Sequence, residues 1–110
     1  MNTISTLPLT VQVHPDRKME ALLAELSPRT SWGNRQIAAQ KLGYMRDPEA
    51  LPALFQALLT DSFWIVRTAI VQALEMIGDP AAIPTLEEVA RKDSFQVVRS
   101  YAKKAIERLS

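Results

Sequence analysis

The sequence predicts an all-α fold, a short α-solenoid of three helical hairpins with a period of 32 residues. The stretch DSFWIVR at residues 61–67 recurs as DSFQVVR at residues 93–99. Residues 35–66 laid over residues 67–98 match identically at twelve positions, and apolar residues in each copy follow a helical spacing. One such hairpin cannot bury its apolar face alone, so the copies are expected to stack.

The repeat divides the chain into an N-terminal arm, residues 1–15, and a repeat domain, residues 16–110. The arm contains TVQV and two prolines, which favours an extended segment. The repeat register sets three approximate units: 16–46, 47–78 and 79–110.

Two helices are expected in each unit, six in all. Their predicted ranges are 16–26, 32–45, 49–60, 63–77, 81–92 and 95–109. In the second unit Asp47 is the expected N-cap, and Pro48 takes the first helical position, where its missing N–H leaves nothing unpaired. Pro52, repeated as Pro84, is expected to kink the first helix of its unit.

The sequence carries signals for both the start and the end of the second helix of the middle unit. Asp61 or Ser62 is expected to cap its N-terminus, and Gly78 offers a left-handed stop. Val66 and Ile70 lie on one face of this helix and are expected in the core.

The string R-x-x-A…A-L…G-D-P-A-A-I-P-x-L…D-S-F-x-V-V-R resembles a HEAT repeat of the short type named for phycobilisome lyases. The resemblance covers about residues 16–110. Its paired DP and D-x-x-x-x-V-R signals are specific for the repeat and not for any one activity.

Three arginines recur at the repeat spacing: Arg35, Arg67 and Arg99. Arg67 flanks the core face of its helix, and a half-buried guanidinium needs acceptors. Asp61, at the same turn, is the expected acceptor, which predicts a ladder with Asp61, Asp93 and carbonyls of neighbouring turns. The resemblance implies that this Asp/Arg pairing is structural. The alternative is anion or phosphate binding.

The two ends of the repeat domain depart from the middle. Arg29 stands at the aspartate position of the first unit and Asn34 at the position of Val66, which predicts a modified cap. Basic residues gather near the last helix: Arg91, Lys92, Arg99, Lys103, Lys104 and Arg108. A polar outer face on a terminal repeat explains them, with nucleic-acid binding as the weaker alternative because Tyr101 is expected on the buried side.

Residues for catalysis or for a cofactor are scarce. The chain has no cysteine, three glycines and one histidine, His14, which lies in the arm. A histidine or cysteine metal site, a nucleophile–histidine pair and a phosphate-binding glycine loop are therefore not expected, so we expect no enzyme, no cofactor and no metal. The formal charge of +1 gives no drive toward nucleic acid. No membrane span or signal peptide is expected, and the expected location is cytoplasmic.

A weakly charged stripe on the second helices, opposite the predicted core, is the candidate partner-binding surface. It comprises Trp32, Gln36, Ala39 and Gly43 in the first unit and Trp64, Thr68, Val71 and Glu75 in the second. The last unit contributes Gln96, Ser100, Lys103 and Glu107. In the alternative interpretation the tryptophans fold over the inter-helix turns, with Phe63 as a hydrophobic staple.

The predicted function is non-enzymatic protein–protein interaction, as a small adaptor, assembly or chaperone-like factor that binds another protein along its inner helices. The alternative follows from SFWIVRTAIVQAL, residues 62–74, which is similar to phycobilisome lyases. That resemblance implies a role in attaching bilins to phycobiliproteins or removing them, with a phycobiliprotein or lyase subunit as partner and a photosynthetic bacterium as source.

Overall fold

The computed structural model describes residues 15–110, and it shows the predicted all-α solenoid. The α-helices are α2 Pro15–Glu25, α3 Trp32–Met45, α4 Leu51–Thr60, α5 Trp64–Ile77, α6 Ile83–Lys92 and α7 Gln96–Leu109. Two short 3₁₀ helices, η2 Pro48–Ala50 and η3 Pro80–Ala82, precede α4 and α6. The predicted arm lies outside the described residues except for Pro15, which begins α2.

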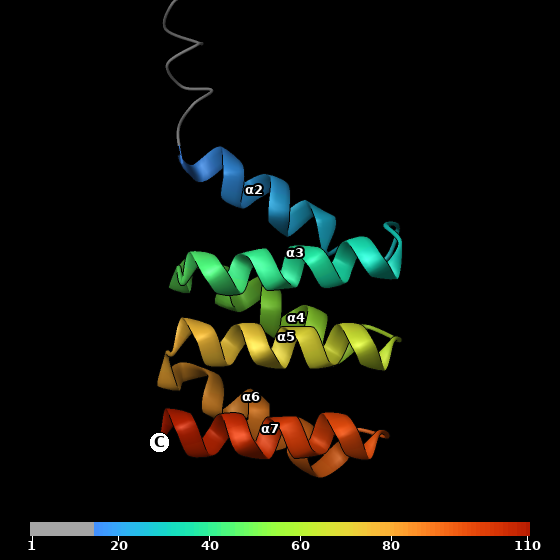
Figure 1. The fold of residues 1–110 in the computed structure, drawn as a ribbon, viewed down its shortest axis with the longest axis vertical. Helices are drawn as coiled ribbons and strands as arrows, with labels where there is room; N and C mark the ends of the chain where they lie inside the picture. Colours follow the sequence, from blue (N-terminus) through green and yellow to red (C-terminus); the bar gives the residue numbers. More distant parts are fainter. Residues whose placement is uncertain (1–14) are drawn as a thin grey trace, which may run out of the picture.

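The helices form three hairpins that stack in one row. Figure 1 shows α3, α5 and α7 side by side, with α4 and α6 behind them and α2 against α3 at one end of the row. The first helix of each hairpin packs on the second, and α5 also packs on both α3 and α7. The second helices therefore form a continuous layer, and the surface that they leave exposed runs through all three units.

The first helices of the second and third units each begin with a turn of 3₁₀ helix. Asp47 accepts a hydrogen bond from the Glu49 N–H at 3.0 Å, and Pro48 follows the cap as predicted. The α-helix begins one residue before Pro52, so this proline lies in the first turn. The N–H groups of the first turn have no acceptor within the helix, so a proline there breaks no helical hydrogen bond. Pro84 has the same place in α6. Both prolines therefore lie at helix starts and not inside a helix, where the sequence placed them, and a kink at either stays a prediction.

The helices α5 and α7 start after an aspartate turn, and α3 and α5 end in a left-handed residue. Phe63 occupies the N-cap of α5 in place of either predicted residue, and its N–H donates to Asp61 Oδ1 at 2.9 Å. Gly78 ends α5 with a φ of 79°, as predicted. Arg46 ends α3 with a φ of 54°, a conformation that is unfavourable for a residue with a side chain. Its guanidinium donates to the Met76 carbonyl at 2.8 Å, which ties the end of α3 to α5.

The core runs along the whole row. Fully buried apolar side chains recur at equivalent positions: Leu42 and Leu74, Leu54 and Leu86, Val66 and Val98. Gly43 is buried where α3 approaches α5, and a Cβ at that position would lie 2.9 Å from the Ala73 Cα. The absence of a side chain at Gly43 therefore permits the close contact between α3 and α5.

Candidate functional site

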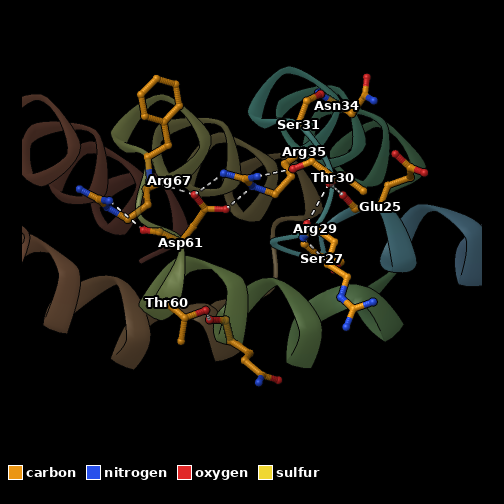
Figure 2. A network of polar contacts seen from close by, with 12 residues as sticks. Glu25, Ser27, Arg29, Thr30, Ser31, Asn34, Arg35, Thr60, Asp61 and Arg67 are labelled. Carbon is orange, nitrogen blue, oxygen red and sulfur yellow. Dashed lines mark hydrogen bonds and ion pairs between the residues drawn. The ribbon is translucent and has the colours of Figure 1, made fainter.

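Two arginines of the repeat bind carboxylates between neighbouring units. Arg35 Nε and Nη2 donate to the two carboxylate oxygens of Asp61 at 2.8 and 3.2 Å (Figure 2). Arg67 Nε and Nη2 donate to those of Asp93 at 2.7 and 3.0 Å. At most 10% of each of these side chains is exposed. The two-pronged, buried geometry is that of a structural ladder.

Arg35 and Arg67 each bind the aspartate carboxylate of the following unit, not that of their own unit as predicted. The sequence pointed to the Asp61 carboxylate as the acceptor for Arg67, because both lie at the same turn. In the structure Arg67 Nη1 takes only the main-chain carbonyl of Asp61, at 2.9 Å. The Asp61 carboxylate accepts instead from Arg35 of the preceding unit and from the Phe63 N–H. Each arginine thus binds a carbonyl of its own unit and a carboxylate of the next.

Arg99 repeats the main-chain contact without the carboxylate contact. Its Nη1 donates to the Asp93 carbonyl, as Arg67 does to the carbonyl of Asp61. No carboxylate among residues 15–110 accepts a hydrogen bond from its Nε or Nη2. At the other end of the repeat domain, Arg29 stands where the later units carry aspartate.

The Asp93 carboxyl is held in its charged form. Burial raises the pKa of this group, but hydrogen bonds from Arg67 and the Phe95 N–H, with the charges of Arg67 and Arg99, outweigh burial and lower the pKa below its ordinary value. A carboxyl whose pKa is depressed in the folded state contributes stability above its unfolded pKa of about 3.9, and this contribution is lost as the pH falls through the folded value.

We therefore expect the free energy of unfolding to fall in acid partly through Asp93. Asp93→Asn should lower stability at pH 7 and should make the decline below about pH 5 shallower, because the variant has no carboxyl at this position to protonate. Urea denaturation at several pH values measures both effects. Parallel stability curves for the variant and the wild-type protein would contradict the role given to this group.

Both tryptophans pack against a phenylalanine of the following unit. The ring centroids of Trp32 and Phe63 are 4.9 Å apart, and those of Trp64 and Phe95 are 5.7 Å apart. The Arg67 guanidinium carbon lies 5.8 Å from the centroid of the Phe95 ring. These contacts agree with the alternative interpretation, in which the tryptophans cover the inter-helix turns, although Trp32 remains 47% exposed.

The predicted binding stripe is wrong at Ala39, Gly43 and Val71, which are buried, whereas its members on α7 are exposed as predicted. Ala39 and Val71 have no exposed surface, because α5 lies between α3 and α7 and packs against both. A partner therefore cannot reach these two residues in the folded chain. Gln36, Thr68 and Glu75 are partly exposed, and their contact with a partner stays a prediction.

A row of exposed or partly exposed positions lies one residue after members of the predicted stripe, about 100° around each helix. We call them the exposed row: Ile37, Gln40 and Tyr44 on α3, Gln72 and Met76 on α5, and Tyr101, Lys104 and Arg108 on α7. A hollow of about 560 Å³ is lined by members of this row from all three helices. The hollow thus extends over the three units.

Positive charge on the exposed row lies on α7. Lys104 and Arg108 are exposed, and Arg108 donates to Glu75 across the contact between α7 and α5. Tyr101 lines the same hollow and is 38% exposed, so its predicted burial is wrong by the same one-residue rotation. An aromatic ring therefore does lie beside the basic residues of α7.

Two further features bear on the predicted absences. Among residues 15–110, no three or more His, Cys, Asp or Glu side chains are grouped as a metal site requires. None of the helices in this range is both long and apolar enough to cross a membrane. His14 lies outside the described residues.

Comparison with known proteins identifies the repeat. A family model described as HEAT repeats matches residues 19–107, which include most of α2 and all of α3 to α6. No curated protein matches the chain. The family match covers more than half of the sequence and includes the Arg/Asp ladder and the exposed row up to Lys104. The chain therefore belongs to the HEAT-repeat family.

Proposed function

We propose that this chain is a non-enzymatic interaction module that binds a partner protein across the exposed row of α3, α5 and α7. HEAT repeats generally mediate protein–protein interaction. The observation that carries the proposal is the hollow of about 560 Å³ lined from all three units. A partner seated there contacts every unit at once, so the stacked arrangement itself shapes the site.

The chemistry of the exposed row suits a polypeptide segment. Tyr44 is 74% exposed, and Tyr101 lies across the hollow from it on α7. Tyrosine supplies a large contact area and is enriched among residues that dominate binding energy. The amides of Gln40 and Gln72 can donate to and accept from main-chain groups, while Lys104 favours an acidic residue at the α7 end. These features support an adaptor, assembly or chaperone-like role.

Truncation of the row tests this proposal. Tyr44→Ala and Tyr101→Ala should each weaken partner binding by at least about 1 kcal/mol while leaving helicity intact, because neither side chain belongs to the buried core. Affinity purification from the native cell identifies the partner, and calorimetry with that partner measures the loss. Trp64→Ala is a poorer probe, because it also removes the contact with Phe95.

Leu59→Ala provides the matched control. Leu59 is 52% exposed and lies on α4, in the layer behind the second helices. This variant should bind the partner as the wild-type protein does. Normal binding by both tyrosine variants would exclude the exposed row as the interaction site.

The role in bilin attachment or removal remains a prediction that rests on the sequence resemblance. Co-expression with an apo-phycobiliprotein and bilin distinguishes the two functions. A coloured covalent product that forms only in the presence of this chain would support the lyase-like role, and its absence together with retained partner binding would support the interaction module.

A further inference from the structure

The residues that line the hollow of the exposed row lie at three levels along the second helices. Members of one level are 32 residues apart in the sequence: Ala69 and Tyr101; Gln40, Gln72 and Lys104; Tyr44, Met76 and Arg108. The helices α3, α5 and α7 run side by side in the same direction (Figure 1). Packed helices lie about 8–10 Å apart, and the close contact at Gly43 holds α3 and α5 together. The middle level therefore forms a straight track across the three units.

The spacing of this track matches one regular conformation of an extended chain. A polyproline II helix has three residues per turn and advances about 9 Å per turn, whereas a β-strand presents the same face again after about 7 Å. Each turn of polyproline II therefore meets the same level on the next unit. We propose that the partner presents a proline-rich segment in this conformation, which crosses α3, α5 and α7 along Gln40, Gln72 and Lys104. This inference rests on the proposed function and names the class of segment that the row binds.

The amides of the track complement the main chain of such a segment. A polyproline II helix makes no internal hydrogen bonds, and proline has no N–H, so its carbonyls require donors from elsewhere. Gln40 and Gln72 are exposed, and their NH₂ groups can donate to carbonyls three residues apart. Gln72 is exposed even though α5 packs against both α3 and α7. Stacking of the units therefore leaves the middle of the track accessible.

The apolar groups beside the track suit proline rings. Tyr44 flanks the track on one side at α3, and Tyr101 flanks it on the other side at α7. Ala69 lines the hollow on the central helix and presents only a methyl group, which leaves room for a ring. Aromatic side chains with such room between them are a recurring receptor for proline-rich segments. An amphipathic helix requires a continuous apolar groove instead, and the two glutamines interrupt one.

Charge places an acidic residue at one end of the segment. Arg108 donates to Glu75 within the hollow, whereas Lys104 is exposed beside Tyr101. Lys104 lies two units from Gln40, a distance that corresponds to two turns of polyproline II, or about six residues. We therefore expect an aspartate or glutamate about six residues from the residue that contacts Gln40.

Titration of the ¹⁵N-labelled chain, observed through the glutamine side-chain NH₂ resonances, tests the inference. The probe is acetyl-Asp-Pro-Pro-Pro-Pro-Pro-Asp-amide, which offers a carboxylate to Lys104 in either direction of binding. It should shift the Gln40 and Gln72 resonances and saturate by millimolar concentration. Gln56, exposed on α4, should not respond. The twin acetyl-Asp-Gly-Ser-Gly-Ser-Gly-Asp-amide should bind at least about tenfold more weakly, because it lacks the rings and loses more conformational freedom on binding.

Three variants assign the contacts. Tyr44→Ala and Gln72→Ala should each weaken binding of the proline peptide about five- to tenfold. Lys104→Gln should weaken it about threefold and should remove its advantage over the Asn-for-Asp form of the same peptide. Gln56→Ala, the same change as Gln72→Ala but in the layer behind, should bind as the wild-type protein does.

The outcomes separate this inference from the proposed function. Displacement of the native partner by the proline peptide is the expected result. Equal binding of the proline and Gly-Ser peptides, unmoved Gln40 and Gln72 resonances, or full binding by Tyr44→Ala and Gln72→Ala would overturn the inference. If the tyrosine variants weaken the native partner but the proline peptide does not displace it, the inference fails and the proposed function stands. A partner segment that is helical when bound would assign the row to an amphipathic helix.

Discussion

Replacement of Arg67 with methionine is expected to lower the free energy of unfolding by about 3–5 kcal/mol. Methionine retains much of the apolar stem but leaves the Asp93 carboxylate, 6% exposed, without its guanidinium partner. The Asp61 carbonyl also loses the donor that lies 2.9 Å away. The stranded buried charge is the larger effect, because burial of an ion without a partner is unfavourable. Urea denaturation at pH 7 measures the loss.

Arg99→Met is the matched control for this prediction. It removes the equivalent side chain, but the described residues give that side chain only the Asp93 carbonyl as acceptor. We expect a loss of about 1 kcal/mol, the contribution of an ordinary hydrogen bond. Addition of Asp93→Asn to Arg67→Met should recover part of the lost stability, because the stranded charge is removed. Equal losses for the two single arginine variants would mean that the buried ion pair contributes little.

Leu74→Ala is expected to destabilise the chain by about 2–5 kcal/mol. Leu74 is fully buried on α5, the helix that packs against α4 in its own unit and against α3 and α7 on either side. Contacts on these sides limit the collapse of the structure around the missing atoms, so a cavity term adds to the lost burial. Thermal unfolding followed by circular dichroism measures the effect.

Leu59→Ala serves as the control for the core prediction. The same chemical change at this half-exposed position on α4 should reduce stability by less than about 1 kcal/mol, because water already covers much of the side chain. Unfolding of Leu74→Ala at the wild-type temperature would contradict the stacked arrangement of the units.

The fold was predictable because the information that specifies it is local and repeated. Helix boundaries follow from capping residues such as Asp47 and from the left-handed stop at Gly78, and both are where the pattern placed them. A capping residue or apolar position that recurs after 32 residues is seldom a chance feature of the sequence, because both copies form the same structural element.

The binding surface was misplaced because a helical wheel assigns one buried side to each helix. The helix α5 contacts α4, α3 and α7, so its buried arc extends round to Val71 and leaves a narrower exposed side at Gln72 and Met76. The width of that arc depends on how the units stack. A helical wheel that assigned α5 contacts with three neighbouring helices would have placed the binding stripe one residue further along the chain.

The carboxylate partner of each arginine was misplaced for a related reason. Asp61 lies six residues before Arg67, and short separation favoured it as the partner. The structure instead joins residues that are 26 positions apart, Arg35 with Asp61 and Arg67 with Asp93. Sequence spacing identifies which residues take part in a ladder, but the direction in which the units stack decides which of them meet.

Because each ion pair crosses from one unit to the next, its stabilisation belongs to the coupling between neighbours and not to the intrinsic stability of either hairpin. Separation of two units breaks the two-pronged contact and the apolar packing around it together, so partial unfolding loses both contributions at once. Strong coupling of this kind favours a single cooperative transition over fraying from the ends. The same pairs set the alignment of the units, since a slip of one helical turn would separate Arg35 from Asp61 and Arg67 from Asp93 together.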